Sequence, residues 1–175
     1  MRRSRGFTLI ELMVVIAIIA ILVTLTVSVT KSDYSGNPHG VSDSVNEAVI
    51  FARQRAVANR RYHRVEVQPN QVIIWQWSQF GMATPTGACP PNCWQYLQKI
   101  SIPNDASIWD AQSTVCAAPG TCSVSQNSSL DFDIDIRPDG SSTGGSIFIT
   151  NRAQNVKYRV LVYQATGSSY ARQNW

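Results

Sequence analysis

The chain has 175 residues, of which 15 are Lys or Arg, 11 are Asp or Glu and 4 are Cys. A chain of this length holds one membrane helix and one modest domain with its own core, which excludes an assembly of several large domains. The formal charge of +4 comes mainly from Arg2, Arg3 and Arg5. Without them 12 basic residues face 11 acidic ones, so the overall charge is weak evidence for a polyanionic partner.

An apolar run covers residues 7–29, and its one ionisable side chain is Glu11. As a helix with a rise of about 1.5 Å per residue, such a run is long enough to cross a bilayer core of roughly 30 Å. Three arginines precede the run, whereas Lys31 is the one cation close behind it. The positive-inside rule therefore predicts a cytoplasmic N-terminus and an exported remainder of the chain.

The apolar run begins directly at a Gly6-Phe7 junction, with Glu11 four positions further on. This stretch resembles the processing motif of type IV prepilins and type II secretion pseudopilins. The resemblance implies that prepilin peptidase cuts after Gly6 and methylates Phe7. We therefore expect residues 1–6 to be a cleaved leader and residues 7–31 to be a transmembrane and assembly helix. The alternative is a plain signal anchor that carries an accidental glutamate.

Glu11 is the predicted assembly residue. A charge inside the membrane is costly, so an intramembrane carboxylate indicates a functional role with a specific partner. In the family that the motif resembles, this partner is the N-terminal amine of a neighbouring subunit. Pairing within a stack of helices would also set the register between subunits.

Residues 32–43 contain Gly and Pro and predict a helix break. A second helix is predicted to begin with Ser44 as N-cap and Glu47 three positions later, as in a capping box. Its apolar stripe consists of Val45, Ala48, Val49, Ala52 and Ala56. The arginines that lie largely off this stripe form either a solvated face or a contact with an acidic partner or neighbouring subunit; they are Arg53, Arg55, Arg60 and Arg61.

Beyond residue 61 the hydrophobic pattern changes to a period of two, which indicates strands. Residues 81–92 and 104–129 are rich in Pro, Gly, Ser, Thr and Ala and are predicted to be loops. The predicted strands are residues 64–67, 72–77, 94–102, 130–136, 146–150, 156–163 and 168–172. These elements predict an α+β periplasmic domain over residues 44–175.

The four cysteines form two close pairs, Cys89 with Cys93 and Cys116 with Cys122. In an exported chain an even number of cysteines indicates disulfides, and the spacing favours each pair closing on itself. Zinc binding is the alternative, although neither His39 nor His63 is near these pairs in the sequence. Loops closed by such short disulfides suggest a surface for display or contact.

Three aspartates, Asp131, Asp133 and Asp135, alternate with apolar residues. In a strand they would share one exposed face, and a calcium site built with loop oxygens is the alternative. The chain shows no nucleophile with a base, no Gly-rich phosphate loop and no other catalytic pattern. We therefore predict a protein that is not an enzyme and that needs no cofactor or metal.

A second resemblance rests on the helix at residues 48–58, the stretch Ile136-Arg-Pro-Asp-Gly140 and the closing Thr166-Gly167. These features are similar to the GspH and FimT family of pseudopilins and minor pilins, which includes FimU. The resemblance implies a long N-terminal helix packed on two antiparallel sheets. It implies a FimU-like minor pilin that primes or caps a type IV pilus, with a GspH-type pseudopilin of a type II secretion system as the alternative.

The same family implies a place in the bacterial inner membrane, with the C-terminal domain in the periplasm, and later in a pilus or pseudopilus at the cell surface. Its partners would be other minor and major pilins or pseudopilins. Some FimT-type members bind DNA through a C-terminal Gly-Arg-x-Arg motif. Residues 167–172 lack the first arginine, but Tyr170 and Arg172, with Trp175, could still offer charge and stacking to a single strand.

Overall fold

The computed structural model describes residues 9–30, 37–78, 93–118 and 120–175. It divides into two compact units, residues 1–33 and residues 34–175. The first unit contains helix α1, Leu9–Thr30, with Glu11 as the acidic residue of its first turn. The described part of the chain has no helix that is both long and apolar enough to span a membrane. The membrane span over residues 7–31 therefore stays a prediction.

The second unit begins with helix α2, Pro38–Asn59, so the predicted start at Ser44 is wrong. Asn37 is the actual N-cap, because its side chain accepts a hydrogen bond from the backbone N–H of His39 at 3.1 Å. Pro38 follows at the first helical position, where its fixed backbone angle suits a helix. The hydroxyl of Ser44 instead donates to the carbonyl of Gly40 inside the helix at 2.9 Å.

In the described residues eight strands form two antiparallel sheets of four strands each, as the resemblance to the GspH and FimT family implies. The first sheet has the order β3-β2-β1-β5, and the second sheet has the order β4-β6-β7-β8. The strands are β1 His63–Gln68, β2 Gln71–Trp77, β3 Trp94–Ser101, β4 Ala106–Gln112, β5 Phe132–Ile136, β6 Gly145–Asn151, β7 Lys157–Val162 and β8 Ser169–Gln173.

Strand β4 corrects the prediction that residues 104–129 form one loop. The strand alternates buried and half-exposed residues, with Ala106 and Ile108 in the core. Its alanine and aspartate residues have low strand preference, so the local sequence does not predict a strand here. The strand is stabilised by its pairing with β6 and by the burial of Ile108.

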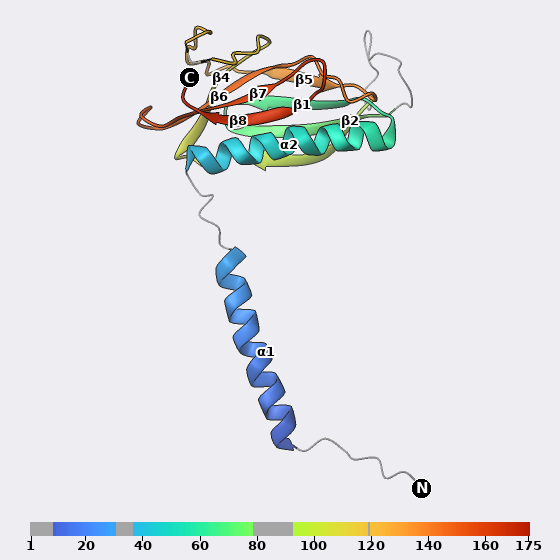
Figure 1. The fold of residues 1–175 in the computed structure, drawn as a ribbon, viewed down its shortest axis with the longest axis vertical. Helices are drawn as coiled ribbons and strands as arrows, with labels where there is room; N and C mark the ends of the chain where they lie inside the picture. The colour runs from blue at the N-terminus through green and yellow to red at the C-terminus, as the bar shows by residue number, and fades with distance from the viewer. Residues whose placement is uncertain (1–8, 31–36, 79–92, 119) are drawn as a thin grey trace. The chain divides into compact units, whose positions relative to one another are not determined.

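The core lies between the two sheets and α2, and Figure 1 shows α2 running along the strands. The predicted stripe of α2, from Val45 to Ala56, is buried at every position. It packs with the inner-facing residues of both sheets, such as Val65, Ile134 and Ile149. Fully burying one such aliphatic side chain contributes about 1.5–3 kcal/mol. Burial of these residues therefore holds α2 and the two sheets together.

The side chain of Arg53 on α2 contacts two turns that are distant from it in the sequence. Its Nε donates to the carbonyl of Thr166 at 2.7 Å and lies 3.3 Å from that of Gly140. Arg53 is therefore a structural residue rather than part of a basic face offered to a partner. Arg55 and Arg60 are exposed, as both interpretations of the arginines require.

Candidate functional site

Helix α1 carries one carboxylate among apolar side chains. From Leu9 to Ile19, nine large apolar side chains are exposed in the isolated chain, with 78% of Leu9 and 72% of Ile10 accessible. Only Glu11 and Ala17 stand between these residues, so the apolar surface surrounds the helix. A helix that is apolar all round requires burial in lipid or among other helices. Glu11 is exposed within this surface, while Gly6 and Phe7 lie outside the described residues.

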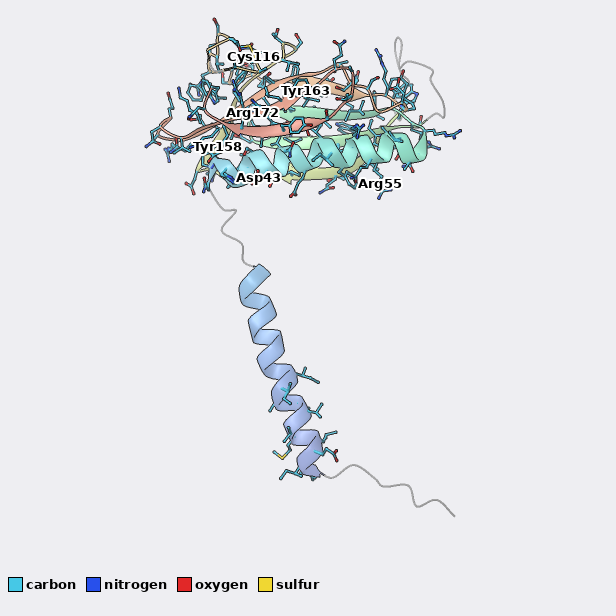
Figure 2. All side chains as sticks on the ribbon, in the orientation of Figure 1. Asp43, Arg55, Cys116, Tyr158, Tyr163 and Arg172 are labelled. Carbon is cyan, nitrogen blue, oxygen red and sulfur yellow. A yellow bond between two sulfur atoms is a disulfide. The ribbon has the colours of Figure 1, made fainter. Side chains whose placement is uncertain are left out.

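A disulfide joins Cys116 to Cys122 in the loop after β4, with the two Cα atoms 5.8 Å apart. Cys93 is also disulfide-bonded, and its predicted partner Cys89 lies outside the described residues. The described cysteines are all oxidised, so they offer no thiolate for the zinc site that was the alternative. Figure 2 shows Cys116 on the opposite side of the β domain from α2, which carries Asp43 and Arg55.

The disulfide loop is fastened to the outer face of the second sheet through its main chain. The backbone N–H of Cys116 donates to the hydroxyl of Ser146, which in turn donates to the carbonyl of Thr114, both at 2.8 Å. One Nη of Arg159 donates to the carbonyl of Ala117 at 3.1 Å. These three bonds hold the loop above β6 and β7.

Arg159 is a buried cation, with only 2% of its surface exposed. Its Nε has no hydrogen-bond partner among the described residues. Burial, and then the positive charge of Arg172, lower the pKa of the Arg159 guanidinium. Arg172 is the direct cross-strand partner of Arg159 in the pairing of β7 with β8. Two cations thus share one face of the second sheet.

Comparison with protein families finds one match, the prokaryotic N-terminal methylation motif, over residues 1–27. Two solved structures of the minor pseudopilin EpsH from the type 2 secretion system of Vibrio cholerae have a similar fold. The first has a TM-score of 0.52 and 12% identity, covering 76% of this chain and 94% of EpsH. The second has a TM-score of 0.50 and 10% identity, covering 77% of this chain and 90% of EpsH.

Motif and fold together support the type IV pilin and pseudopilin superfamily. Comparison with curated proteins finds no match. At this level of identity the EpsH structures support the two-sheet fold alone. The motif covers the N-terminal segment that carries Glu11.

The pilin-like domain places Tyr170 and Arg172 on the outer face of the edge strand β8. Tyr170 is 54% exposed and meets Tyr163 edge-on, with ring centroids 5.9 Å apart. Figure 2 labels Tyr163 and Arg172 on this sheet. Arg159 joins this group through its pairing with Arg172, and the sequence analysis missed it. The alternation of β7 places residue 159 on the outer face, but its burial depends on the loop above it.

Two of the three predicted aspartates, Asp133 and Asp135, lie on β5 and form ion pairs with Arg64, whereas Asp131 precedes the strand. Arg64 of β1 binds Asp135 with two parallel hydrogen bonds, Nε to Oδ1 at 2.7 Å and Nη2 to Oδ2 at 3.1 Å. Its other Nη lies 2.7 Å from Asp133. Burial raises the pKa of Asp133, and the charge of Arg64 opposes this shift. The described residues contain no group of three potential metal ligands from His, Cys, Asp and Glu.

The two histidines have separate structural contacts. His39 lies 2.9 Å from Asp43 in the first turns of α2 and meets Tyr158 edge-on. His63 at the start of β1 is fully buried, and its Nδ1 lies 3.1 Å from the carbonyl of Arg61. Burial lowers the pKa of His63. Neither contact brings an imidazole to a hydroxyl or thiol nucleophile.

Proposed function

We propose that the chain is a minor pilin, a non-catalytic structural subunit that helps to prime or cap a type IV pilus near its tip. The observation that carries the proposal is the composition of α1, whose exposed apolar side chains surround a single carboxylate, Glu11. In water this surface is unfavourable. Lipid before assembly, and neighbouring subunits after it, would cover it.

The methylation motif over residues 1–27 supports the following sequence of processing and assembly. Prepilin peptidase removes residues 1–6 and methylates Phe7. Residues 7–31 hold the subunit in the bacterial inner membrane, with the β domain in the periplasm. The subunit then enters a fibre beside other pilins, where Glu11 pairs with the N-terminal amine of a neighbour.

Replacing Glu11 by leucine tests this role. A buried pair that loses one partner leaves the other charge uncompensated, at a cost of about 3–5 kcal/mol. We expect Glu11→Leu protein to be processed and retained in the inner membrane but strongly depleted from sheared fibres. Glu11→Asp keeps the carboxylate and should restore part of the incorporation. Incorporation of Glu11→Leu at the wild-type level would contradict the assembly role.

Leader removal is measured in the same strains by intact mass. Gly6→Ala should leave Arg2, Arg3 and Arg5 attached, whereas Glu11→Leu should be processed normally. This control separates a defect in assembly from a defect in cleavage. Removal of the leader in a strain that lacks prepilin peptidase would refute the processing step and the family role with it.

The second candidate is a GspH-type pseudopilin of a type II secretion system, and the fold similarity to EpsH favours it. The same strains separate the two roles. A pseudopilin would be required for secretion of exoproteins and would be absent from sheared surface pili. A minor pilin would be present in sheared pili, and its loss would reduce their number while secretion continues.

The third candidate is a minor pilin that binds DNA, and the exposure of Tyr170 and Arg172 on β8 favours it. Phosphate contacts make such binding strongly dependent on salt. Arg172→Ala would then reduce both DNA binding and its salt dependence. Loss of DNA uptake without loss of Glu11-dependent fibre assembly would support this candidate.

A further inference from the structure

The outer face of the first sheet, which points away from α2 and the core, carries an unusual row of side chains. Cross-strand pairing places Tyr96, Trp75, Arg64 and Asp135 side by side across all four strands. The next pair on the same face joins Glu66 of β1 to Ile73 of β2. Aromatic rings therefore lie over β2 and β3, and charges lie over β1 and β5.

The aromatic rings of this face are positioned by contacts with one another and with Arg64. Trp75 meets Tyr96 edge-on with centroids 5.9 Å apart, and Trp94 meets Trp77 edge-on at 5.0 Å. The guanidinium of Arg64 lies 4.6 Å from the centroid of Trp94. Tyr96 nevertheless remains 57% exposed, and Trp75 and Trp94 are only half-buried. Much aromatic surface thus remains open to solvent.

A cavity of about 270 Å³ lies on this face, lined by Arg64, Glu66, Trp75 and Trp94. Pockets for drug-sized ligands occupy roughly 300–1,000 Å³, so this cavity suits a smaller ligand or one part of a larger one. Two indole rings form apolar walls. One guanidinium and one carboxylate supply donors and acceptors.

The polar groups of the cavity are held in place by neighbours. Trp75 Nε1 donates to one carboxylate oxygen of Glu66 at 2.6 Å, and the side-chain amide of Gln68 donates to the other. A carboxylate offers about four lone-pair sites, so Glu66 can accept further hydrogen bonds. Asp133 and Asp135 fix Arg64 from the opposite side. The cavity therefore presents a pre-arranged acceptor beside two indole rings.

The charges around the cavity select against anions. Glu66, Asp133 and Asp135 outnumber Arg64 by three carboxylates to one guanidinium, so an anion such as a phosphate meets net repulsion. Asp133 and Asp135 are already paired with Arg64, and Arg64 already lies over the ring of Trp94. A neutral ligand with both hydroxyl groups and an apolar face avoids the repulsion and can use both the carboxylate of Glu66 and the indole rings.

We propose that this cavity binds a neutral sugar residue of a glycan. A pyranose ring presents C–H groups on its faces, which pack on aromatic rings, and hydroxyl groups at its edge, which donate to a carboxylate such as Glu66. Trp75 and Trp94 supply the packing surface, and Tyr96 extends it for a neighbouring sugar unit. The inference goes beyond the proposed role in fibre assembly and does not depend on it.

The test uses the full-length protein, purified in a detergent without a sugar headgroup and titrated with lactose, maltose and N,N′-diacetylchitobiose. The indole N–H signals in a proton–nitrogen NMR spectrum report on each tryptophan separately. We expect at least one of these neutral disaccharides to shift the Trp75 and Trp94 signals saturably, with millimolar affinity. Trp109 and Trp175 belong to the second sheet and its C-terminal end, so their signals should not move.

Variants locate the binding site. Trp94→Ala should weaken binding at least about tenfold, because stacking on an aromatic ring is lost. Glu66→Gln keeps the size of the side chain and should weaken binding severalfold, since a charge-assisted acceptor is lost. Trp109→Ala is the matched control, because this tryptophan is also half-buried but lies on β4. It should bind as the wild type does.

Three results would overturn the proposal. One is the absence of a saturable shift of Trp75 or Trp94 with every neutral disaccharide up to about 50 mM, where even weak millimolar binding is close to saturation. Another is unchanged binding by Trp94→Ala or, if that variant does not fold, by Glu66→Gln. The third is tighter binding of glucuronate than of the neutral sugars, since its carboxylate carries the charge that the site should repel.

Discussion

Arg53 of α2 donates from Nε to the carbonyl oxygen of Thr166 at 2.7 Å, a hydrogen bond between residues 113 positions apart. The same guanidinium is near the carbonyl of Gly140, and Gly167 follows Thr166 directly. The two turns that contribute to the resemblance with the GspH and FimT family therefore meet at one residue of α2. These two turns therefore help to attach α2 to the β domain through Arg53.

Gly167→Ala should destabilise the β domain because of this contact. Gly167 has a φ of 58°, and an added Cβ would collide with the carbonyl oxygen of Gly140. Gly120 has a φ of 74° but open space around its Cβ position, so Gly120→Ala isolates the backbone cost of about 1–2 kcal/mol. Gly167→Ala should cost roughly 1–3 kcal/mol more, as overpacking does. Urea unfolding measures both, and equal losses would contradict the predicted collision.

Protonation of His63 should make the domain less stable in mild acid. Burial lowers the pKa of His63 in the folded state below its ordinary value of about 6.5. Below that pH the unfolded chain takes up a proton that the folded chain resists, so the free energy of unfolding should fall as the pH drops below about 6.5. Urea unfolding between pH 7.5 and pH 5 measures this slope.

His63→Gln should flatten the slope between pH 6.5 and pH 5, whatever its effect on stability at pH 7.5. His39→Gln is the matched control, since His39 is largely exposed and lies 2.9 Å from Asp43. In the His39→Gln variant the free energy of unfolding should still fall between pH 6.5 and pH 5, because His63 is unchanged. A His63→Gln variant with the wild-type slope would show that another group controls stability in this range.

Opening the disulfide between Cys116 and Cys122 should lower the stability of the domain without changing the packing of its core. A loop this short closes with an entropic benefit of roughly 2 kcal/mol. Replacing both cysteines by serine should therefore lower the free energy of unfolding by about that amount, while the spectrum of the core methyl groups stays unchanged. Peptide mapping without reduction should recover this pair and join Cys93 to Cys89. A mapped bond between Cys93 and Cys116 would contradict both pairings.

The sequence predicts most of the strands well because alternation is strong where strands bury one face. Residues 64–67 and 72–77 alternate clearly around a short turn, and the structure has the hairpin of β1 and β2 there. The stripe of α2 is equally periodic, and each predicted residue is buried. These patterns are local, so a sequence window contains them in full.

The failures concern features that depend on distant partners. Strand β4 has weak local preference and exists through its pairing with β6, about 40 residues away. The burial of Arg159 depends on the loop that covers it. The start of α2 was missed because the capping pattern at Ser44 and Glu47 competes with Asn37 and Pro38, and only the structure decides which of the two caps the helix.

The attachment of the disulfide loop has a consequence for how its sequence can change. Ser146 and Arg159 hold the loop by the main-chain atoms of Thr114, Cys116 and Ala117. Because every residue type offers a main-chain carbonyl and Cys116 supplies the one N–H, substitutions of the exposed side chains of the loop leave its fastening intact. The described part of this loop can therefore diversify its surface chemistry under selection without a change in the shape of the sheet beneath it.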